Sequence, residues 1–261
     1  MCRLFGVIAN KPVDVEFSFL YGSKAFKDFA EGNPDGWGIG WYEEGTPIVS
    51  KKPVCADSSD MFLNRAKSVM SKIIIAHVRK SSRGEKTEAN CHPFEYGKWI
   101  FAHNGTVCNH DGLCSKLDSQ HRAAIQGETD SEVLFHWLLQ NIEIAGSVSK
   151  GLQSALSEVN EFTALNFLLS DGITLYAYRN ASGGNGYYTL YFLRRKRQDR
   201  LPETLKSAET RALFSSKSLR DEKAVLVCSE KLTEDEEDWK EIPNENLLEI
   251  RSDLSTNLVN I

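Results

Sequence analysis

The chain has 261 residues, of which 41% are hydrophobic and 26% are charged, and its formal net charge at pH 7 is −5. This length is enough for one large domain or two small ones, and the composition is ordinary for a soluble globular protein. The acidic balance argues against a main role in binding nucleic acid, because phosphate groups are bound by clustered positive charge.

Neither a membrane segment nor a secretory signal is expected. No apolar run approaches the roughly 18 residues that a membrane-spanning helix needs, and the N-terminus lacks a charged segment followed by an apolar one. The cysteines lack the compact spacing of a disulfide framework and lie at positions 2, 55, 91, 108, 114 and 228. Scattered thiols fit a reducing compartment, so the sequence predicts a cytoplasmic protein.

The first half of the chain predicts mainly strands. Residues 4–9 form an apolar run of strand length, residues 10–12 predict a turn, and residues 16–30 have a moderate helical pattern. Turn signals precede a strand over residues 37–41, and residues 46–50 predict its partner. A short helix is expected over residues 59–70, with Ser58 or Ser59 as its N-cap. The continuous apolar run at residues 73–78 is typical of a strand buried on both faces.

The second half places two helices between strands. A short buried strand over residues 99–102 runs directly into His103-Asn104-Gly105, where we expect the strand to give way to a loop. One helix begins at Thr129 or Asp130, and a second covers residues 149–160. Residues 163–178 predict a hairpin, and further strands are expected at 187–193 and 223–228. A basic run at 194–197 and an acidic run at 234–238 indicate solvated surface.

The order of these elements predicts the fold class. Strands come first, then two adjacent helices, then strands again, which suits two sheets between helical layers better than a regular alternation of strand and helix. We therefore expect an α+β fold, a four-layer αββα sandwich of two mainly antiparallel sheets. Neither an internal repeat nor a low-complexity linker interrupts the chain, so residues 1–261 are predicted to form a single domain.

The second residue of the chain offers a nucleophile. Removal of Met1 would leave Cys2 with a thiol and a free α-amine on one residue. A free thiol has a pKa near ~8.5, and an α-amine titrates near ~7.7–8.0, so the amine can accept the proton of the thiol near neutral pH. Nucleophile and base would then come from the same residue.

Polar residues at the ends of the predicted strands complete a plausible site. If Cys2 attacks a carbonyl carbon, Asn104 and Gly105 supply a side-chain amide and a backbone N–H that could stabilise the oxyanion. Arg79 suits a carboxylate, and Asp130 suits an ammonium group. A nucleophile, oxyanion donors and opposite charges for a zwitterion indicate an amino acid with a side-chain amide, such as glutamine.

These residues lie in segments that resemble the class II glutamine amidotransferases, which are N-terminal-nucleophile hydrolases with an αββα sandwich. The segments occur in the order of that family and are Cys2, His77-Val78-Arg79, Cys91-His92-Pro93-Phe94, His103-Asn104-Gly105 and Glu128-Thr129-Asp130-Ser131-Glu132. Further segments are most similar to the stand-alone YafJ-type branch, at residues 33–38, 83–85, 166–172, 229–233, 238–239 and 242–243. The resemblance covers nearly the whole chain.

The resemblance implies a role for each site residue. Cys2 is the nucleophile, with Asn104 and Gly105 as the oxyanion hole. Arg79 holds the α-carboxylate of the substrate and Asp130 its α-ammonium, and His92 and Ser82 match positions on the substrate side. The implied reaction forms a γ-glutamyl thioester, releases ammonia or an amine, and ends in hydrolysis to glutamate, without a metal or an organic cofactor.

Two departures from the family pattern leave the leaving group open. Lys80 follows the arginine where well-studied members have tryptophan, and Arg83 stands where histidine is frequent. We expect no second catalytic domain that would consume ammonia. The ammonia would pass to a separate synthase protein, or the enzyme would hydrolyse a γ-glutamyl amide or peptide, as related stand-alone members do in glutathione and ergothioneine metabolism.

Two other classes of function compete with this interpretation. A structural zinc site could draw on a group of cysteines and histidines within one segment, namely Cys91, His92, His103, Cys108, His110 and Cys114. Their spacing matches no standard zinc finger, because the usual close cysteine pair is missing. A non-catalytic interaction module with the same fold is the other alternative.

Overall fold

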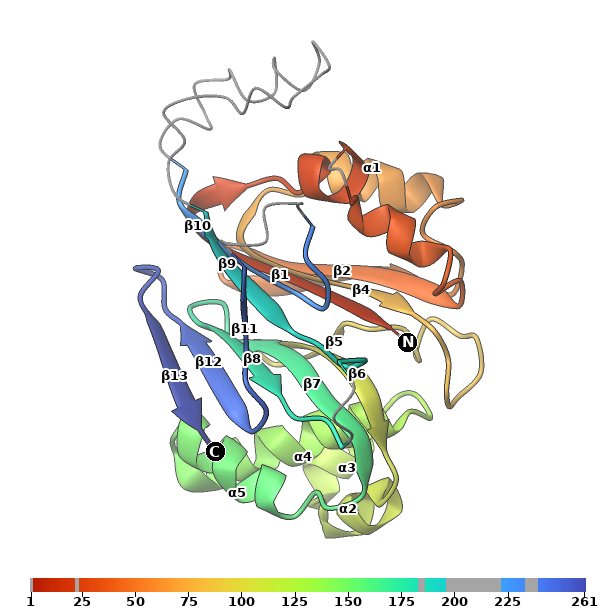
Figure 1. Ribbon diagram of the computed structural model, residues 1–261. Coiled ribbons are helices and arrows are strands. Elements are labelled where there is room, and N and C mark those ends of the chain that lie inside the picture. The colour runs from red at the N-terminus through yellow and green to blue at the C-terminus, as the bar shows by residue number, and fades with distance from the viewer. Residues whose placement is uncertain (1, 22–23, 183–185, 196–221, 233–238) are drawn as a thin grey trace.

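The computed structural model describes all residues except 1, 22–23, 183–185, 196–221 and 233–238. Within this part of the chain, two sheets stack face to face and helices cover both outer faces (Figure 1). The acidic run at 234–238, part of the basic run at 194–197, and Met1 lie outside the described residues. No helix among the described residues is both long and apolar enough to cross a membrane.

The first sheet is antiparallel throughout and carries the N-terminal strand near its middle. Its strands, in spatial order, are β11 (Trp239–Glu241), β9 (Tyr191–Arg195), β10 (Ala224–Cys228), β1 (Arg3–Val13), β4 (Ser71–Arg79), β2 (Gly36–Glu43) and β3 (Thr46–Lys52). β1 and β10 are neighbours in this sheet although they lie far apart in the sequence, and Phe5 pairs with Cys228.

The second sheet is also antiparallel throughout. Its order is β13 (Thr256–Asn260), β12 (Asn246–Ile250), β8 (Leu175–Arg179), β7 (Phe162–Ser170), β6 (Trp99–Val107) and β5 (Phe94–Tyr96). On its outer face lie α2 (His110–Lys116), α3 (Ser119–Ala124), α4 (Asp130–Ala145) and α5 (Val148–Ser157).

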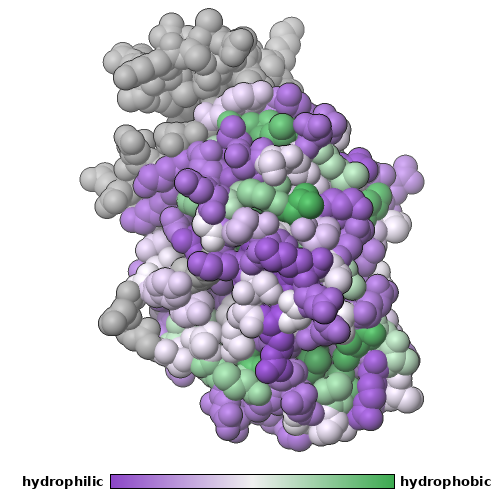
Figure 2. Space-filling view, turned by 90° about the vertical axis from the view of Figure 1, so that its right-hand side faces the viewer, coloured by the Kyte–Doolittle hydropathy of each residue, from purple (hydrophilic) through white to green (hydrophobic). Residues whose placement is uncertain are grey.

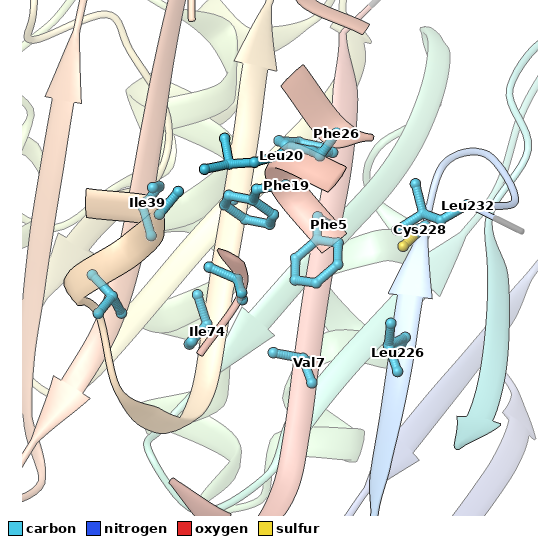
Figure 3. Close-up of a cluster of buried hydrophobic side chains, with 14 of the residues drawn as sticks. Phe5, Val7, Phe19, Leu20, Phe26, Ile39, Ile74, Leu226, Cys228 and Leu232 are labelled. Carbon is cyan, nitrogen blue, oxygen red and sulfur yellow. The ribbon is translucent and has the colours of Figure 1, made fainter. Parts of the chain in front are cut away.

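Alternation along the strands sorts the apolar side chains into three layers. On β4, Ile73 and Ile75 face the second sheet, whereas Ile74 and Val78 face outward. The outward row packs with Phe5, Phe19 and Phe26 in the cluster of Figure 3, beneath α1 (Asp60–Ser68). The third cluster joins the second sheet to α4 and α5. This is the expected αββα sandwich.

Two local predictions were wrong. Residues 10–12 do not form a turn, because β1 continues to Val13 with a register shift that accommodates Pro12. The helical pattern of residues 16–30 yields two single turns, a π-helical one at Phe17–Tyr21 and a 3₁₀ one at Phe26–Ala30. Burial of Phe19 and Phe26 against Phe5 fixes these turns without a long helix.

A third correction affects the site. The predicted strand over residues 99–102 extends to Val107, so Asn104 and Gly105 lie within β6 and pair with Asn166 and Leu165 of β7. Their positions are therefore set by the backbone ladder of the second sheet, which is a more rigid support than a loop.

Candidate active site

Cys2 lies at the end of β1, beside the last residue of β4. Arg3 pairs with Val78, so the Cys2 side chain meets the backbone that follows Arg79. Its Sγ lies 3.2 Å from the backbone nitrogen of Lys80 and 3.3 Å from the Lys80 carbonyl oxygen. Burial raises the pKa of the Cys2 thiol, although the Lys80 N–H and the charges of Arg79 and Arg3 oppose that rise. A thiol in this setting needs a base to become a thiolate.

A pocket of about 290 Å³, including space open to solvent, opens in front of Cys2. It is lined by residues from both sheets and from the start of α4, namely Cys2, His77, Arg79, Lys80, Ser81, Ser82, Arg83, His92, His103, Gly105, Thr129, Asp130 and Ser131. The end of the sandwich that carries the N-terminus faces the viewer in Figure 2, and its surface there is mainly hydrophilic.

Asn104 and Gly105 lie on the β6 side of this pocket. Gly105 lines it, and the buried Asn104 side chain belongs to the row of β6 that faces the first sheet. The Asn104 Nδ2 has no hydrogen-bond partner among the described residues. A buried amide without a partner costs about 1–3 kcal/mol, so the site retains a donor that a bound oxygen can satisfy. At Gly105 a Cβ would lie 1.9 Å from the Ala164 carbonyl oxygen, so only glycine fits.

Arg79 ends β4, and its buried guanidinium points into the segment that follows it. It donates to the carbonyl oxygens of Arg83 (2.9 Å), Gly84 (3.3 Å) and Glu85 (3.1 Å), and to Ser81 Oγ (3.2 Å). We call residues 80–86 the arginine loop. The loop turns its carbonyl groups toward Arg79, which lies beside Cys2.

Asp130 is the first residue of α4 and is almost completely buried. The N-cap is Thr129, whose side chain accepts a hydrogen bond from the Glu132 nitrogen, so Asp130 is not the cap. Its Oδ2 accepts from the backbone nitrogen of Val107 at 2.6 Å, which joins the start of α4 to the end of β6. Asp130 also lines the pocket, as Arg79 does.

The two remaining predicted residues also line the pocket. His92 is buried, and its Nδ1 accepts from the backbone nitrogen of His103 at 3.3 Å. Ser82 lies in the arginine loop with its Oγ 3.3 Å from Thr106 Oγ1. All predicted site residues except Asn104 are therefore pocket-lining, and Asn104 adjoins the lining residue Gly105.

His77 and His103 line the pocket but were not predicted as site residues. His77 shares a strand face with Arg79, two positions away, and both of its ring nitrogens lack a hydrogen-bond partner among the described residues. Burial, reinforced by the positive charge of the nearby Arg79, lowers the pKa of His77 to about 3. Burial also lowers the pKa of His92 and of His103. Two features of the sequence could have indicated these histidines. His77 and His103 both lie in segments that resemble the family, and His77 lies two residues before Arg79, so both side chains point to the same face of a strand.

The cysteines and histidines considered for zinc do not converge. His103 is held by Ser131 Oγ at 2.9 Å and by the Ala164 carbonyl oxygen at 3.1 Å, and His110 faces Arg83. Among the described residues no group of three or more His, Cys, Asp or Glu side chains is placed to share a metal ion.

Comparison with known proteins agrees with this fold and pocket. The family model described as "Glutamine amidotransferases class-II" matches residues 1–259. An uncharacterized protein of Methanocaldococcus jannaschii is 34% identical over 95% of this chain and 68% of its own length. YafJ of Escherichia coli, assigned by name to the glutamine amidotransferases, is 30% identical over 94% of this chain and 96% of its own.

A solved structure supports the fold independently. The glutamine aminotransferase class-II domain protein from Silicibacter pomeroyi has a TM-score of 0.65 and 22% identity over 100% of this chain and 99% of its own. The four-layer sandwich with its antiparallel sheets is that of the N-terminal-nucleophile hydrolases. Within that class, the chain belongs to the class II glutamine amidotransferase family and is an enzyme of this type. Its relatives include stand-alone proteins such as YafJ.

Proposed function

We propose that this enzyme hydrolyses the side-chain amide of glutamine or of a γ-glutamyl compound, with Cys2 as the nucleophile. The observation that supports this best is the position of Cys2 Sγ at the head of a polar pocket, with Arg79 contributed by the first sheet and Asp130 by the helical face of the second. A zwitterionic amino acid suits a pocket with opposite charges on its two sides.

The chemistry begins with the α-amine of Cys2, which becomes available when Met1 is removed. In this mechanism the amine takes the thiol proton, and the thiolate attacks the γ-carbonyl carbon of the substrate. Asn104 Nδ2 and the Gly105 N–H donate to the oxyanion. The ammonium form of the amine returns the proton to the leaving nitrogen, so ammonia departs and a γ-glutamyl thioester remains. Water, deprotonated by the same amine, then releases glutamate and the thiol.

Substrate binding divides between the two sheets. We assign the α-carboxylate to Arg79 and the α-ammonium to Asp130, with His92 and Ser82 as further contacts. The neutral state that burial imposes on His92 suits a contact with an uncharged amide. Both charged residues have most of their surface excluded from water, which strengthens their interaction with a ligand.

Intact-mass measurement with the glutamine-shaped electrophile diazo-oxo-norleucine tests the nucleophile. The spectrum before treatment reports whether Met1 is present. We expect one adduct on Cys2, suppressed by excess glutamine, and none on Cys2→Ala. The variant Cys108→Ser is the matched control, because Cys108 is exposed and free and lies outside the pocket lining. An adduct that persists in Cys2→Ala, or full turnover by that variant, would overturn the mechanism.

A second candidate substrate class is favoured by the rim of the pocket. Lys80 and Arg83 both line it, and they add positive charge on the arginine loop beside Cys2. Positive charge there suits a γ-glutamyl peptide whose leaving amine carries a carboxylate. Comparing γ-glutamyl-glycine with γ-glutamyl-glycinamide isolates that carboxylate. If kcat/KM is about tenfold higher for γ-glutamyl-glycine, and Lys80→Ala or Arg83→Gln removes this preference, the peptide class is supported. Equal kcat/KM for the two compounds excludes it.

We also propose that residues 1–261 form one domain that works in the cytoplasm. All six cysteines are free in the structure, which suits a reducing compartment. Ammonia from glutamine would pass to a separate synthase protein or to solvent. Stoichiometric release of glutamate and ammonia by the purified protein would support independent action, whereas strict dependence on an added protein would contradict it.

A further inference from the structure

Asp35 connects the arginine loop to the body of the first sheet. It precedes β2, and its backbone nitrogen donates to the Arg79 carbonyl oxygen at 3.0 Å. The next residue, Gly36, pairs with Arg79 in the ladder between β2 and β4. The Asp35 side chain is therefore fixed beside the point where the chain leaves β4 and enters the loop.

The Asp35 carboxylate binds both ends of the loop. Its Oδ2 accepts from the Ser81 backbone nitrogen at 2.9 Å, and its Oδ1 lies 2.5 Å from Lys86 Nζ. The Asp35 side chain is 14% exposed, while that of Lys86 is 63% exposed. Burial disfavours the ionised carboxylate, but the contacts with Lys86 and Ser81 prevail and hold the pKa of Asp35 below its ordinary value. The carboxylate is thus ionised at neutral pH and clamps residues 81 and 86.

The residues between these two points surround Arg79. The carbonyl oxygens of residues 83–85 accept from the guanidinium, and Ser81 Oγ accepts from it as well. The far side of the loop is tied to the segment that precedes α4, because Asn90 donates to the Glu85 carbonyl oxygen at 3.1 Å and accepts from the Glu128 nitrogen at 2.8 Å. The direction of the guanidinium therefore depends on a loop that Asp35 closes.

We propose that Asp35 is a positioning residue that sets the affinity for the substrate carboxylate through the arginine loop, with Lys86 as its counter-charge. This proposal rests on the proposed function, since it takes Arg79 as the group that binds the α-carboxylate. Asp35 does not line the pocket, so it acts on binding without touching the substrate. Its loss raises KM and leaves kcat nearly unchanged, because Cys2 and the oxyanion donors stay in place.

Three variants separate the two contacts of Asp35. Asp35→Ala removes both, and we expect KM for the substrate to rise about tenfold or more with kcat within about threefold. Asp35→Asn keeps an acceptor for the Ser81 nitrogen and should recover part of the affinity. Lys86→Gln removes only an exposed ion pair, so we expect it to raise KM by about two- to fivefold.

Asp171 offers a matched control at the other end of the sandwich. Its carboxylate also pairs with an exposed lysine, Lys98, at 3.3 Å and accepts from backbone nitrogens of its turn, Ile173 and Thr174. Its side chain is 13% exposed, close to the value for Asp35. Asp171→Ala should leave KM unchanged. If it raises KM as much as Asp35→Ala does, the effect is general destabilisation and the positioning role is wrong.

Two measurements that need no turnover complete the test. Trypsin can cut after Lys80, Arg83 and Lys86, and Asp35→Ala should be cut in this loop about tenfold faster than the unmodified enzyme. Glutamine, or γ-glutamyl-glycine, should bind Cys2→Ala measurably and bind the Cys2→Ala, Asp35→Ala double variant about tenfold more weakly. Equal binding by the two overturns the role of Asp35 alone. Absence of both binding and turnover in the unmodified enzyme overturns the proposed function and this role together.

Discussion

Single atoms decide the chemistry that the pocket can support. The Asn104 amide is buried without a partner, and the Gly105 backbone passes so close to Ala164 that a side chain has no room. At the same scale, the Cys2 thiol rests on the Lys80 backbone, where burial keeps it protonated. These features favour a site that stabilises a negative oxygen and needs a base near the sulfur.

Replacing Asn104 with alanine separates catalysis from folding. The lost Nδ2 donor has no partner among the described residues, so the free energy of unfolding should change by only about 1 kcal/mol. The loss of an oxyanion donor should lower kcat by about 10²–10³-fold. Urea unfolding and steady-state kinetics on the same preparation measure both quantities. An unchanged kcat would remove Asn104 from the proposed oxyanion hole.

Glycine at position 105 is predicted to be indispensable. A methyl group there would collide with the Ala164 carbonyl oxygen, so β6 and β7 must move apart and displace the second proposed oxyanion donor. Gly105→Ala should cost about 1–3 kcal/mol of stability and at least about 100-fold in kcat. Gly112→Ala is the control, since a Cβ there meets nothing within 4 Å. Wild-type kinetics in Gly105→Ala would contradict the packing argument.

At the scale of elements, the sequence predicted those that have strong local signals. The apolar run of β4 was predicted correctly, because propensity and burial agree there. The N-caps of α1 and α4, Ser59 and Thr129, were each one of two predicted candidates. The helical pattern of residues 16–30 does not produce one helix, because packing of the aromatic side chains determines the conformation of that segment. The extension of β6 past Ala102 was missed because pairing with β7, which lies far along the chain, decides where the strand ends.

The candidate site was predictable only in part, for a related reason. Cys2, Arg79 and Asp130 were predicted as site residues from their residue types and from motif order, and all three line the pocket. Asp35 was placed in a turn and in a segment similar to the YafJ-type branch, without a role of its own. Its contacts with Ser81 and Lys86 are made only through the fold. Contacts between distant segments leave no local periodicity in the sequence.

The start of α4 should control where Asp130 lies. Thr129 caps the helix through its side chain, and replacement by alanine typically costs about 1 kcal/mol. Thr129→Ala should lower stability by that amount and raise KM about two- to fivefold, because the first turn that carries Asp130 loosens. Ser147→Ala at the start of α5 is the control, since the Ser147 side chain makes no capping hydrogen bond. If Thr129→Ala and Ser147→Ala lower stability and raise KM equally, the Thr129 cap does not control the position of Asp130.

At the scale of the whole molecule, buried neutral histidines make the fold sensitive to acid. Burial lowers the pKa of His77 to about 3 and that of His136 to about 4, below the ordinary value for histidine. Because the unfolded chain takes up these protons first as the pH falls, this contribution to stability is complete only above about pH 6.5. It declines from there down to about pH 4 for His136 and about pH 3 for His77. The loss should reach about 1 kcal/mol per histidine near pH 5.5.

Urea unfolding at about pH 7.5 and 5.5 measures this decline. The variant His136→Gln should lose one histidine's share of it, because glutamine can still bind His121 without titrating. An identical pH dependence in the variant and the parent protein would show that His136 titrates with an ordinary pKa.

The location of Cys2 on a central strand also bears on how the protein is made. Leu4 donates its backbone N–H to Ser229 Oγ and accepts at its carbonyl from the Ser229 nitrogen, so one edge of β1 is bound by a residue 225 positions later in the chain. On a ribosome, β1 can pair early with β4, but its other edge stays open until β10 has emerged. The Cys2 thiol is therefore synthesised long before the neighbouring strand is paired on both edges. A nascent chain that lacks β10 carries the thiol without this support, so we expect the proposed activity only after β10 has paired with β1.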